Sequence, residues 1–135
     1  QSVSADPEQI QTEYQNAFNL IKARRYDAAM KALADFVNKY ANSDYAGNAQ
    51  YWLGELNFVR RNFKEAIVEF NKVVISYPKS KKVHDAILKQ GFSYYELSDW
   101  ENARKSLAEL TKSLPGDSTI AKLADERLKK MKKED

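Results

Sequence analysis

Cysteine is absent from the 135-residue chain, and histidine occurs only once. Without cysteine there can be no disulfide framework and no thiolate metal site. His84 has no cluster of other ligand types around it, so we interpret it as a solvated or capping residue rather than a zinc ligand. Gly-rich phosphate loops and the GxSxG and HExxH motifs are missing as well. The sequence therefore predicts no catalytic, cofactor-binding or metal site, and we do not expect an enzyme.

Long apolar runs are also missing. No segment approaches the ~20 apolar residues that a membrane-spanning helix needs, so we expect no membrane insertion. The first residues, Gln1-Ser2-Val3, include neither an initiator methionine nor the charged and apolar regions of a signal peptide. We therefore expect a processed form or an excised domain of a longer protein.

Charge is only mildly unbalanced, with 22 Lys and Arg against 19 Asp and Glu and a formal net charge of +3. The excess comes mostly from two lysine groups, in residues 79–82 and 129–133. Neither group is interleaved with aromatic residues, and Glu134 and Asp135 follow the second. A solvated face explains such runs better than a phosphate-binding site, so we predict no nucleic-acid partner.

A pattern of residues recurs every 37 positions. The recurring columns are Tyr26, Phe63 and Trp100; Ala29, Ala66 and Ala103; Leu33, Phe70 and Leu107; Tyr40, Tyr77 and Leu114. Ahead of them lies a column of small residues, Ala17, Gly54 and Gly91. We interpret the small column as the place where one helix lets the next approach closely, with the alanine column as the facing small surface.

A second series marks the expected helix starts. Its members, Asp6, Ser43, Ser80 and Asp117, also lie 37 residues apart. Each carries an oxygen that can accept hydrogen bonds from the free N–H groups of a first helical turn. Strand patterns are absent, so we predict an all-α fold of three helical hairpins and a C-terminal capping helix, about seven helices in all. The predicted divisions are a loose N-terminal end at 1–6 and one domain at 7–133, with repeats at about 7–43, 44–80 and 81–117 and the capping helix at about 118–132.

The middle repeat resembles a tetratricopeptide unit. The residues that carry this resemblance are Leu53, Gly54, Phe63, Ala66, Phe70 and Pro78. It extends from about residue 7 to residue 132 and implies a solenoid of stacked helix pairs. The usual repeat has about 34 residues, and we expect the three additional ones to extend the start of the first helix of each pair.

The first helices of the pairs offer the candidate binding surface, because they line the concave groove of a tetratricopeptide stack. Their i, i+4, i+7 rows read Tyr14, Phe18 and Ile21; Tyr51, Glu55 and Phe58; Leu88, Phe92 and Tyr95. The predicted protein-binding residues are all of these except Ile21. With many aromatics and few charges, the groove suits an extended segment or an amphipathic helix. Alternatively, these side chains only pack against neighbouring repeats.

Three longer sequence segments support a resemblance more specific than that to a tetratricopeptide unit. They are YANSDYAGNAQYWLGELNF, FNKVVISYPKSKKVHDAILKQG and LPGDSTIAKLADERL. They resemble the C-terminal domain of the Tol-Pal-associated YbgF/CpoB family of cell division coordinators. The resemblance implies a non-enzymatic periplasmic scaffold that binds TolA and the septal peptidoglycan synthase complex, and that coordinates peptidoglycan synthesis with outer-membrane constriction. It also implies a signal sequence and a trimerising coiled coil before this domain, whereas the isolated chain, which has no heptad seam, is expected to be a monomer.

Two other functions stay open. One is a general peptide-docking module for chaperones or assembly factors. Modules of that kind grip the C-terminal carboxylate of a partner with a pattern of Lys and Asn on the first helices of the pairs. The columns equivalent to the Asn positions here hold Phe18, Glu55 and Phe92, which disfavours this function. The other is an accessory domain of a cell-wall enzyme whose catalytic part lies outside this chain. The preceding sequence would separate them: heptads after a signal peptide favour the coordinator, and a catalytic module favours the accessory domain.

Overall fold

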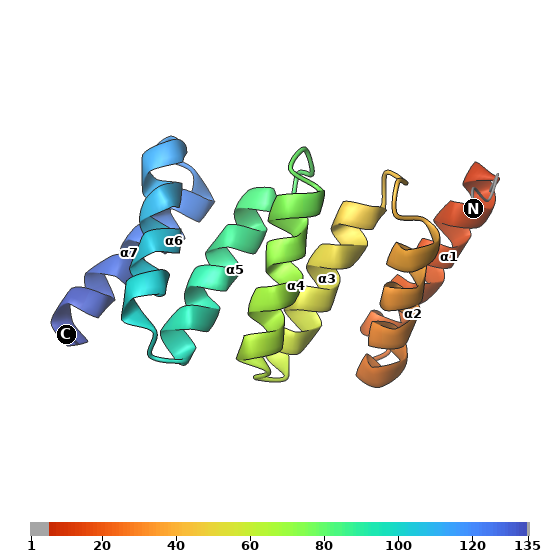
Figure 1. The fold of residues 1–135 in the computed structure, drawn as a ribbon, viewed down its shortest axis with the longest axis horizontal. Helices are drawn as coiled ribbons and strands as arrows, with labels where there is room; N and C mark the ends of the chain where they lie inside the picture. Colours follow the sequence, from red (N-terminus) through yellow and green to blue (C-terminus); the bar gives the residue numbers. More distant parts are fainter. Residues whose placement is uncertain (1–5, 135) are drawn as a thin grey trace.

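The computed structural model describes residues 6–134, and this part of the chain contains helices and no strand. In order, the helices are α1 (Pro7–Lys22), α2 (Tyr26–Lys39), α3 (Ala46–Val59), α4 (Phe63–Ser76), α5 (Val83–Glu96), α6 (Trp100–Ser113) and α7 (Thr119–Glu134) (Figure 1). The prediction of an all-α solenoid with about seven helices is confirmed. The predicted loose end falls mostly on residues 1–5, which lie outside the described residues.

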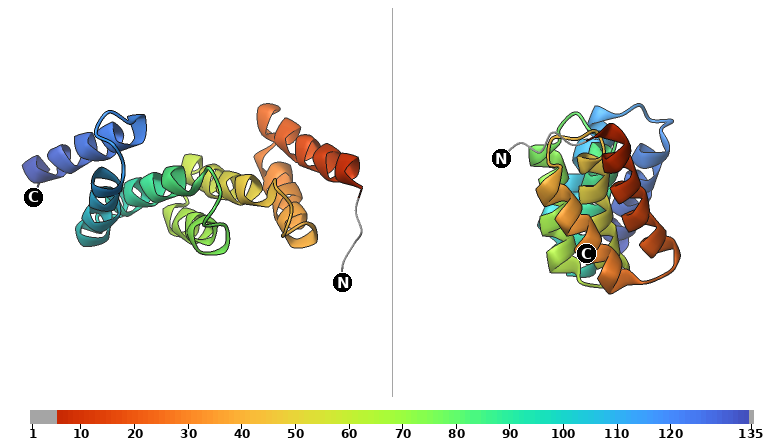
Figure 2. Two further views of the ribbon diagram at one scale, coloured as in Figure 1. Left: turned by 90° about the horizontal axis from the view of Figure 1, so that it is seen from above. Right: turned by 90° about the vertical axis from the view of Figure 1, so that its right-hand side faces the viewer.

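Each helix packs against the next along the chain, so that α1–α2, α3–α4 and α5–α6 form successive hairpins and α7 covers the last one. Contacts also join α3 to α5 and α5 to α7. Seen from above, the odd-numbered helices lie on one side of the solenoid and the even-numbered helices on the other (Figure 2). The stack curves toward the odd-numbered side. The first helices of the pairs therefore line the inner face.

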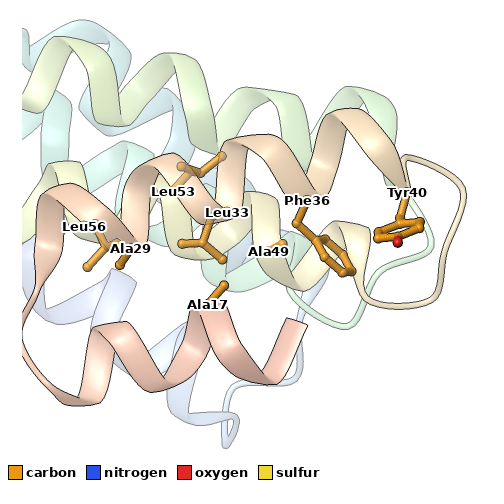
Figure 3. Packing of buried hydrophobic residues seen from close by; sticks show 8 residues of the cluster. All are labelled: Ala17, Ala29, Leu33, Phe36, Tyr40, Ala49, Leu53 and Leu56. Atoms are coloured by element: carbon orange, nitrogen blue, oxygen red, sulfur yellow. The ribbon is translucent and has the colours of Figure 1, made fainter. Parts of the chain in front are cut away.

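The core is a line of clusters between the helices rather than one central mass. The N-terminal cluster joins α1, α2 and α3 through Ala17, Ala29, Leu33, Phe36, Tyr40, Ala49, Leu53 and Leu56 (Figure 3). Two further clusters continue it toward α7. All three members of the alanine column, Ala29, Ala66 and Ala103, are fully buried, as close packing of the helix pairs requires.

The small column makes room for large side chains. A Cβ added at Gly54 would meet the ring of Phe70, and one added at Gly91 would meet Leu107. Phe70 and Leu107 follow the alanines by one helical turn and lie on the same helix face. Their longer side chains are the nearest neighbours of the two glycines, so the contact surface is not made of the alanines alone.

Helix starts agree only partly with the predicted series. Asp6 caps α1, accepting a hydrogen bond from the Glu8 N–H at 3.1 Å. Neither Ser43 nor Ser80 is an N-cap, since α3 and α5 begin three residues later, after a short turn, with no side-chain cap. At α7 the cap is Ser118, whose Oγ accepts from the Ala121 N–H at 2.9 Å, and not Asp117. In the second and third repeats the additional residues thus lengthen the loops at 40–45 and 77–82 instead of extending the helix. In the first repeat α1 begins directly after Asp6, as expected, and has 16 residues against 14 in α3 and α5.

The tight turns inside the hairpins use a left-handed residue that is not glycine. These residues are Arg24, Arg61 and Ser98, with φ angles of 60°, 64° and 61°. In the third turn the Asp99 N–H donates to the Tyr94 carbonyl at 2.9 Å and the Ser98 N–H to the Tyr95 carbonyl at 3.0 Å. This pattern satisfies the last carbonyls of α5 in the manner of a Schellman motif. A side chain in this conformation carries a steric cost that glycine avoids.

We therefore expect Ser98→Gly to raise the free energy of unfolding by about 0.5–1 kcal/mol, the steric relief exceeding the entropic cost of glycine. The measurement is the urea midpoint at constant m-value. Ser98→Ala is the control and should bring no gain, because it keeps the Cβ. A lower midpoint for Ser98→Gly would contradict this account of the turn.

Candidate functional site

At the N-terminal end of the inner face, Tyr14 and Phe18 of α1 lie against α3 and its preceding loop. The Tyr14 ring stacks on Tyr45 with centroids 5.1 Å apart, and its hydroxyl accepts a hydrogen bond from the Asn48 side-chain amide. Burial raises the pKa of the Tyr14 hydroxyl above its usual value. Phe18 meets the edge of Trp52 at 5.5 Å. Both rings remain partly exposed, so they join two repeats and still present surface.

Two of the predicted binding residues belong to the core. Tyr51 on α3 is 6% exposed and packs against Phe70 and Trp52, with centroids 5.6 and 5.9 Å away. Lys82, at the start of α5, places its Nζ 5.0 Å from the centre of the Tyr51 ring. Leu88 on α5 is 4% exposed. Neither Tyr51 nor Leu88 can offer much contact area to a partner.

At the centre of the inner face, Lys89 of α5 connects to α3. Its Nζ donates to Glu55 Oε1 at 2.9 Å and lies 4.8 Å from the centre of the Phe58 ring. Phe58 in turn meets Phe63 edge to face at 5.4 Å. The Lys89 and Glu55 side chains are 24% and 16% exposed, so this ion pair is screened less by water than one on an open surface.

At the C-terminal end, α7 covers the aromatic residues of α5. The Arg127 guanidinium carbon lies 4.1 Å from the ring centre of Phe92 and 4.6 Å from that of Tyr95. Lys130 approaches Tyr95 at 5.7 Å, and Tyr95 packs on Trp100 at 5.3 Å. Phe92 and Tyr95 are partly exposed, so cations and rings form a shared surface here.

The expectation of few charges on the inner face is wrong. Lys82, Lys89 and Arg127 lie over the aromatic rings of the preceding inner helix, and a cation over a ring is stabilising. The i, i+4, i+7 rows of each inner helix do not include these cations, because the cations come from the neighbouring repeat. A search for basic residues about one repeat after each inner-face aromatic could have found them.

We call the remaining partly exposed set the inner groove: Tyr14, Phe18, Glu55, Phe58, Phe92 and Tyr95. Its rings offer apolar contact area, and the basic residues beside them offer hydrogen bonds to acidic or carbonyl groups. Such a surface can hold a peptide segment that mixes apolar and acidic side chains.

Other kinds of site find little support in residues 6–134. No group of three or more His, Asp or Glu side chains in that range comes together in a way that could hold a metal ion. Within the same range, no helix is long and apolar enough to cross a membrane.

Comparison with known proteins places the chain among helical repeats. A family model described as "Tetratricopeptide repeat" matches residues 14–81, and a second one with the same description matches residues 85–117. "Cell division coordinator CpoB" of Pseudomonas putida is 49% identical over 59 residues, which are 44% of this chain and 22% of that protein. The protein of the same name from Escherichia coli K12 is 44% identical over 48 residues, 35% of this chain and 18% of that one.

The resemblance to the cell division coordinators is thus confirmed as a similarity, over a segment that spans about a fifth of the relatives' length. The first family model alone covers just over half of the chain, and the helix pairs have the arrangement that it describes. The chain belongs to the tetratricopeptide repeat family.

Proposed function

We propose that this chain is a non-enzymatic protein-interaction module of a periplasmic, Tol-Pal-linked scaffold. In this proposal it binds TolA and coordinates peptidoglycan synthesis with outer-membrane constriction during cell division. The similarity to proteins named cell division coordinators supports a role in cell division. The tetratricopeptide family supports protein partners, because stacked helix pairs create an extended concave surface suited to binding them.

The inner groove is the observation that carries this proposal. Its aromatic rings belong to the helices that line the concave side of the stack, and each stays partly exposed. Aromatic side chains provide large contact area at little cost in rotamer freedom, so they often dominate the energy of an interface. The partner segment is a helix or extended chain laid along α1, α3, α5 and α7.

We expect Phe58→Ala and Phe92→Ala each to weaken binding of a TolA fragment by about 1–3 kcal/mol, the range for interface anchors. The measurement is calorimetric titration of each variant, with circular dichroism to confirm an intact helical fold. Phe58 and Phe92 lie on different repeats, so a loss in both variants would trace the partner along the groove.

The matched control is Val68→Ala. Val68 is 53% exposed on α4, on the outer side of the solenoid, so this change also shortens an exposed apolar side chain. It should leave binding unchanged. If Val68→Ala weakens binding and the two phenylalanine variants do not, the partner lies on the outer side and the groove assignment is overturned. If the wild-type chain does not bind the TolA fragment at all, TolA is not its partner.

A further inference from the structure

Beside the inner groove lies a pocket of about 660 Å³ whose walls come from two neighbouring inter-repeat loops. One wall is the loop between α2 and α3 together with the first turn of α3, and the other is the loop between α4 and α5. Tyr14 lines both this pocket and the inner groove. A segment bound along the groove could therefore continue into the pocket. The volume is within the range of ordinary ligand pockets.

Three lysines stand on one wall of the pocket: Lys79, Lys81 and Lys82. These lysines are not part of the 37-residue repeat pattern. The corresponding positions are Asn42, Asp44 and Tyr45 in the preceding loop and Gly116, Ser118 and Thr119 in the following one. Within the described part of the chain, none of the three lysines forms an ion pair with a carboxylate. Asp44 is the one acidic residue that lines the pocket, so its lining has an excess of positive charge.

The opposite wall adds hydrogen-bond donors. Gly47 and Asn48, in the first turn of α3, line the pocket, and this helix start has no side-chain cap. Its free N–H groups and the helix dipole both favour an anion. Ser43 also lines the pocket, and its Oγ is buried with no hydrogen-bond partner among the described residues.

Gly47 keeps the two walls close together. A Cβ added there would come within 2.9 Å of Ser80 Oγ and 3.0 Å of Ser80 Cβ. The Ser80 hydroxyl is already engaged, because it accepts a hydrogen bond from the Lys82 N–H at 3.0 Å. The lysine wall is thus held against α3 by contacts that do not use the ammonium groups of Lys79 and Lys81, whereas that of Lys82 lies over the Tyr51 ring.

We propose that this pocket binds the side-chain carboxylates of an acidic peptide segment, belonging to the partner that lies along the inner groove. The proposal rests on the proposed function for the identity of that partner. The chemistry of the pocket is independent of it: the ammonium groups of Lys79 and Lys81, which form no ion pair within the described part of the chain, share the pocket with the free N–H donors at the start of α3. Continuity with the aromatic groove favours a peptide over a free small anion, since the peptide gains contacts in both places.

The test is an NMR titration of the whole isotope-labelled chain with C-terminally amidated tetraglutamate as the probe. We expect saturable shifts of the amide signals of Asn48, Lys81 and Lys82 that weaken as salt is added. Lys79→Glu combined with Lys81→Glu should weaken the affinity for the probe about ten-fold, since each exposed charge pair contributes a modest energy. The control is Lys64→Glu combined with Lys105→Glu, which makes the same charge change on the outer helices and should leave the titration unchanged.

Two further probes distinguish the sources of the negative charge. Tetraglutamine with a free C-terminus is a peptide whose only carboxylate is the terminal one. Inorganic phosphate is an anion without a peptide chain. Equal shifts with either would overturn the assignment to side-chain carboxylates of a peptide. Shifts that the control variant reduces as much as the pocket variant would show a non-specific charge effect and would also overturn it. Because none of these probes is TolA, the outcome does not depend on whether TolA is the partner.

Discussion

Gly54→Leu is expected to lower the free energy of unfolding by at least about 3 kcal/mol, at the upper end of overpacking effects. Even the Cβ of such a side chain would lie 2.5 Å from Phe70 Cε1 and 2.8 Å from Phe70 Cγ, far inside van der Waals contact. The Phe70 side chain is fully buried, so it cannot move aside into solvent. Helices α3 and α4 would have to separate, and urea denaturation followed by circular dichroism would measure the loss.

A graded series sharpens this test. Gly91→Ala should cost less than Gly54→Ala, because the added Cβ meets the flexible end of Leu107, at 2.6 Å from Cδ2, rather than a ring. Gly116→Ala is the control: nothing lies within 4 Å of the added Cβ, and we expect a change below about 0.5 kcal/mol. If Gly54→Ala and Gly116→Ala have the same midpoint, the close approach of α3 and α4 is not real.

Phe70→Leu offers a rescue that the first repeat suggests. There the equivalent pair is Ala17 and Leu33, both buried in the same cluster. Combining Gly54→Ala with Phe70→Leu would reproduce that pair in the middle repeat. We expect the double variant to be more stable than the sum of the single changes predicts, by a coupling of about 0.5–3 kcal/mol. An additive result would mean that the two positions do not meet.

Tyr51→Ala is expected to cost about 3–5 kcal/mol of folding stability, as large aromatic-to-alanine changes in cores do. The ring is 6% exposed and fills the space between Phe70, Trp52 and the Lys82 side chain. Although the helical row places Tyr51 among the groove residues, its effect should therefore appear in the denaturant midpoint. Binding of a partner by the molecules that remain folded should change little.

Tyr51→Phe is the matched control, because it keeps the buried ring and removes only the hydroxyl. Its midpoint should stay much closer to wild type than that of Tyr51→Ala. If Tyr51→Ala instead leaves the midpoint unchanged and weakens partner binding, Tyr51 is an interface anchor and its side chain is not part of the core.

The repeat can be predicted from the sequence alone. The helices α4 (Phe63–Ser76) and α6 (Trp100–Ser113) begin at an aromatic residue of one recurring column and end just before the next. The 37-residue period, the buried alanine column and the seven helices follow from the same pattern. Helical periodicity and repeated packing positions are carried by residues close in sequence, so they can be read without knowing which helices meet.

Tertiary structure decided the rest. Ser43 and Ser80 have the right residue type for a cap, yet the loop turns once more before α3 and α5 begin, and no local signal marks that turn. Tyr14 and Tyr51 occupy the same place in their helical rows, 37 residues apart, but Phe70 and Trp52 bury the second, while the first packs on Tyr45 and stays partly exposed. Burial in a solenoid depends on side chains that arrive from the next helix or the next repeat. The position of a residue on its own helix therefore determines which way it faces, and only the stacking of the repeats determines what covers it.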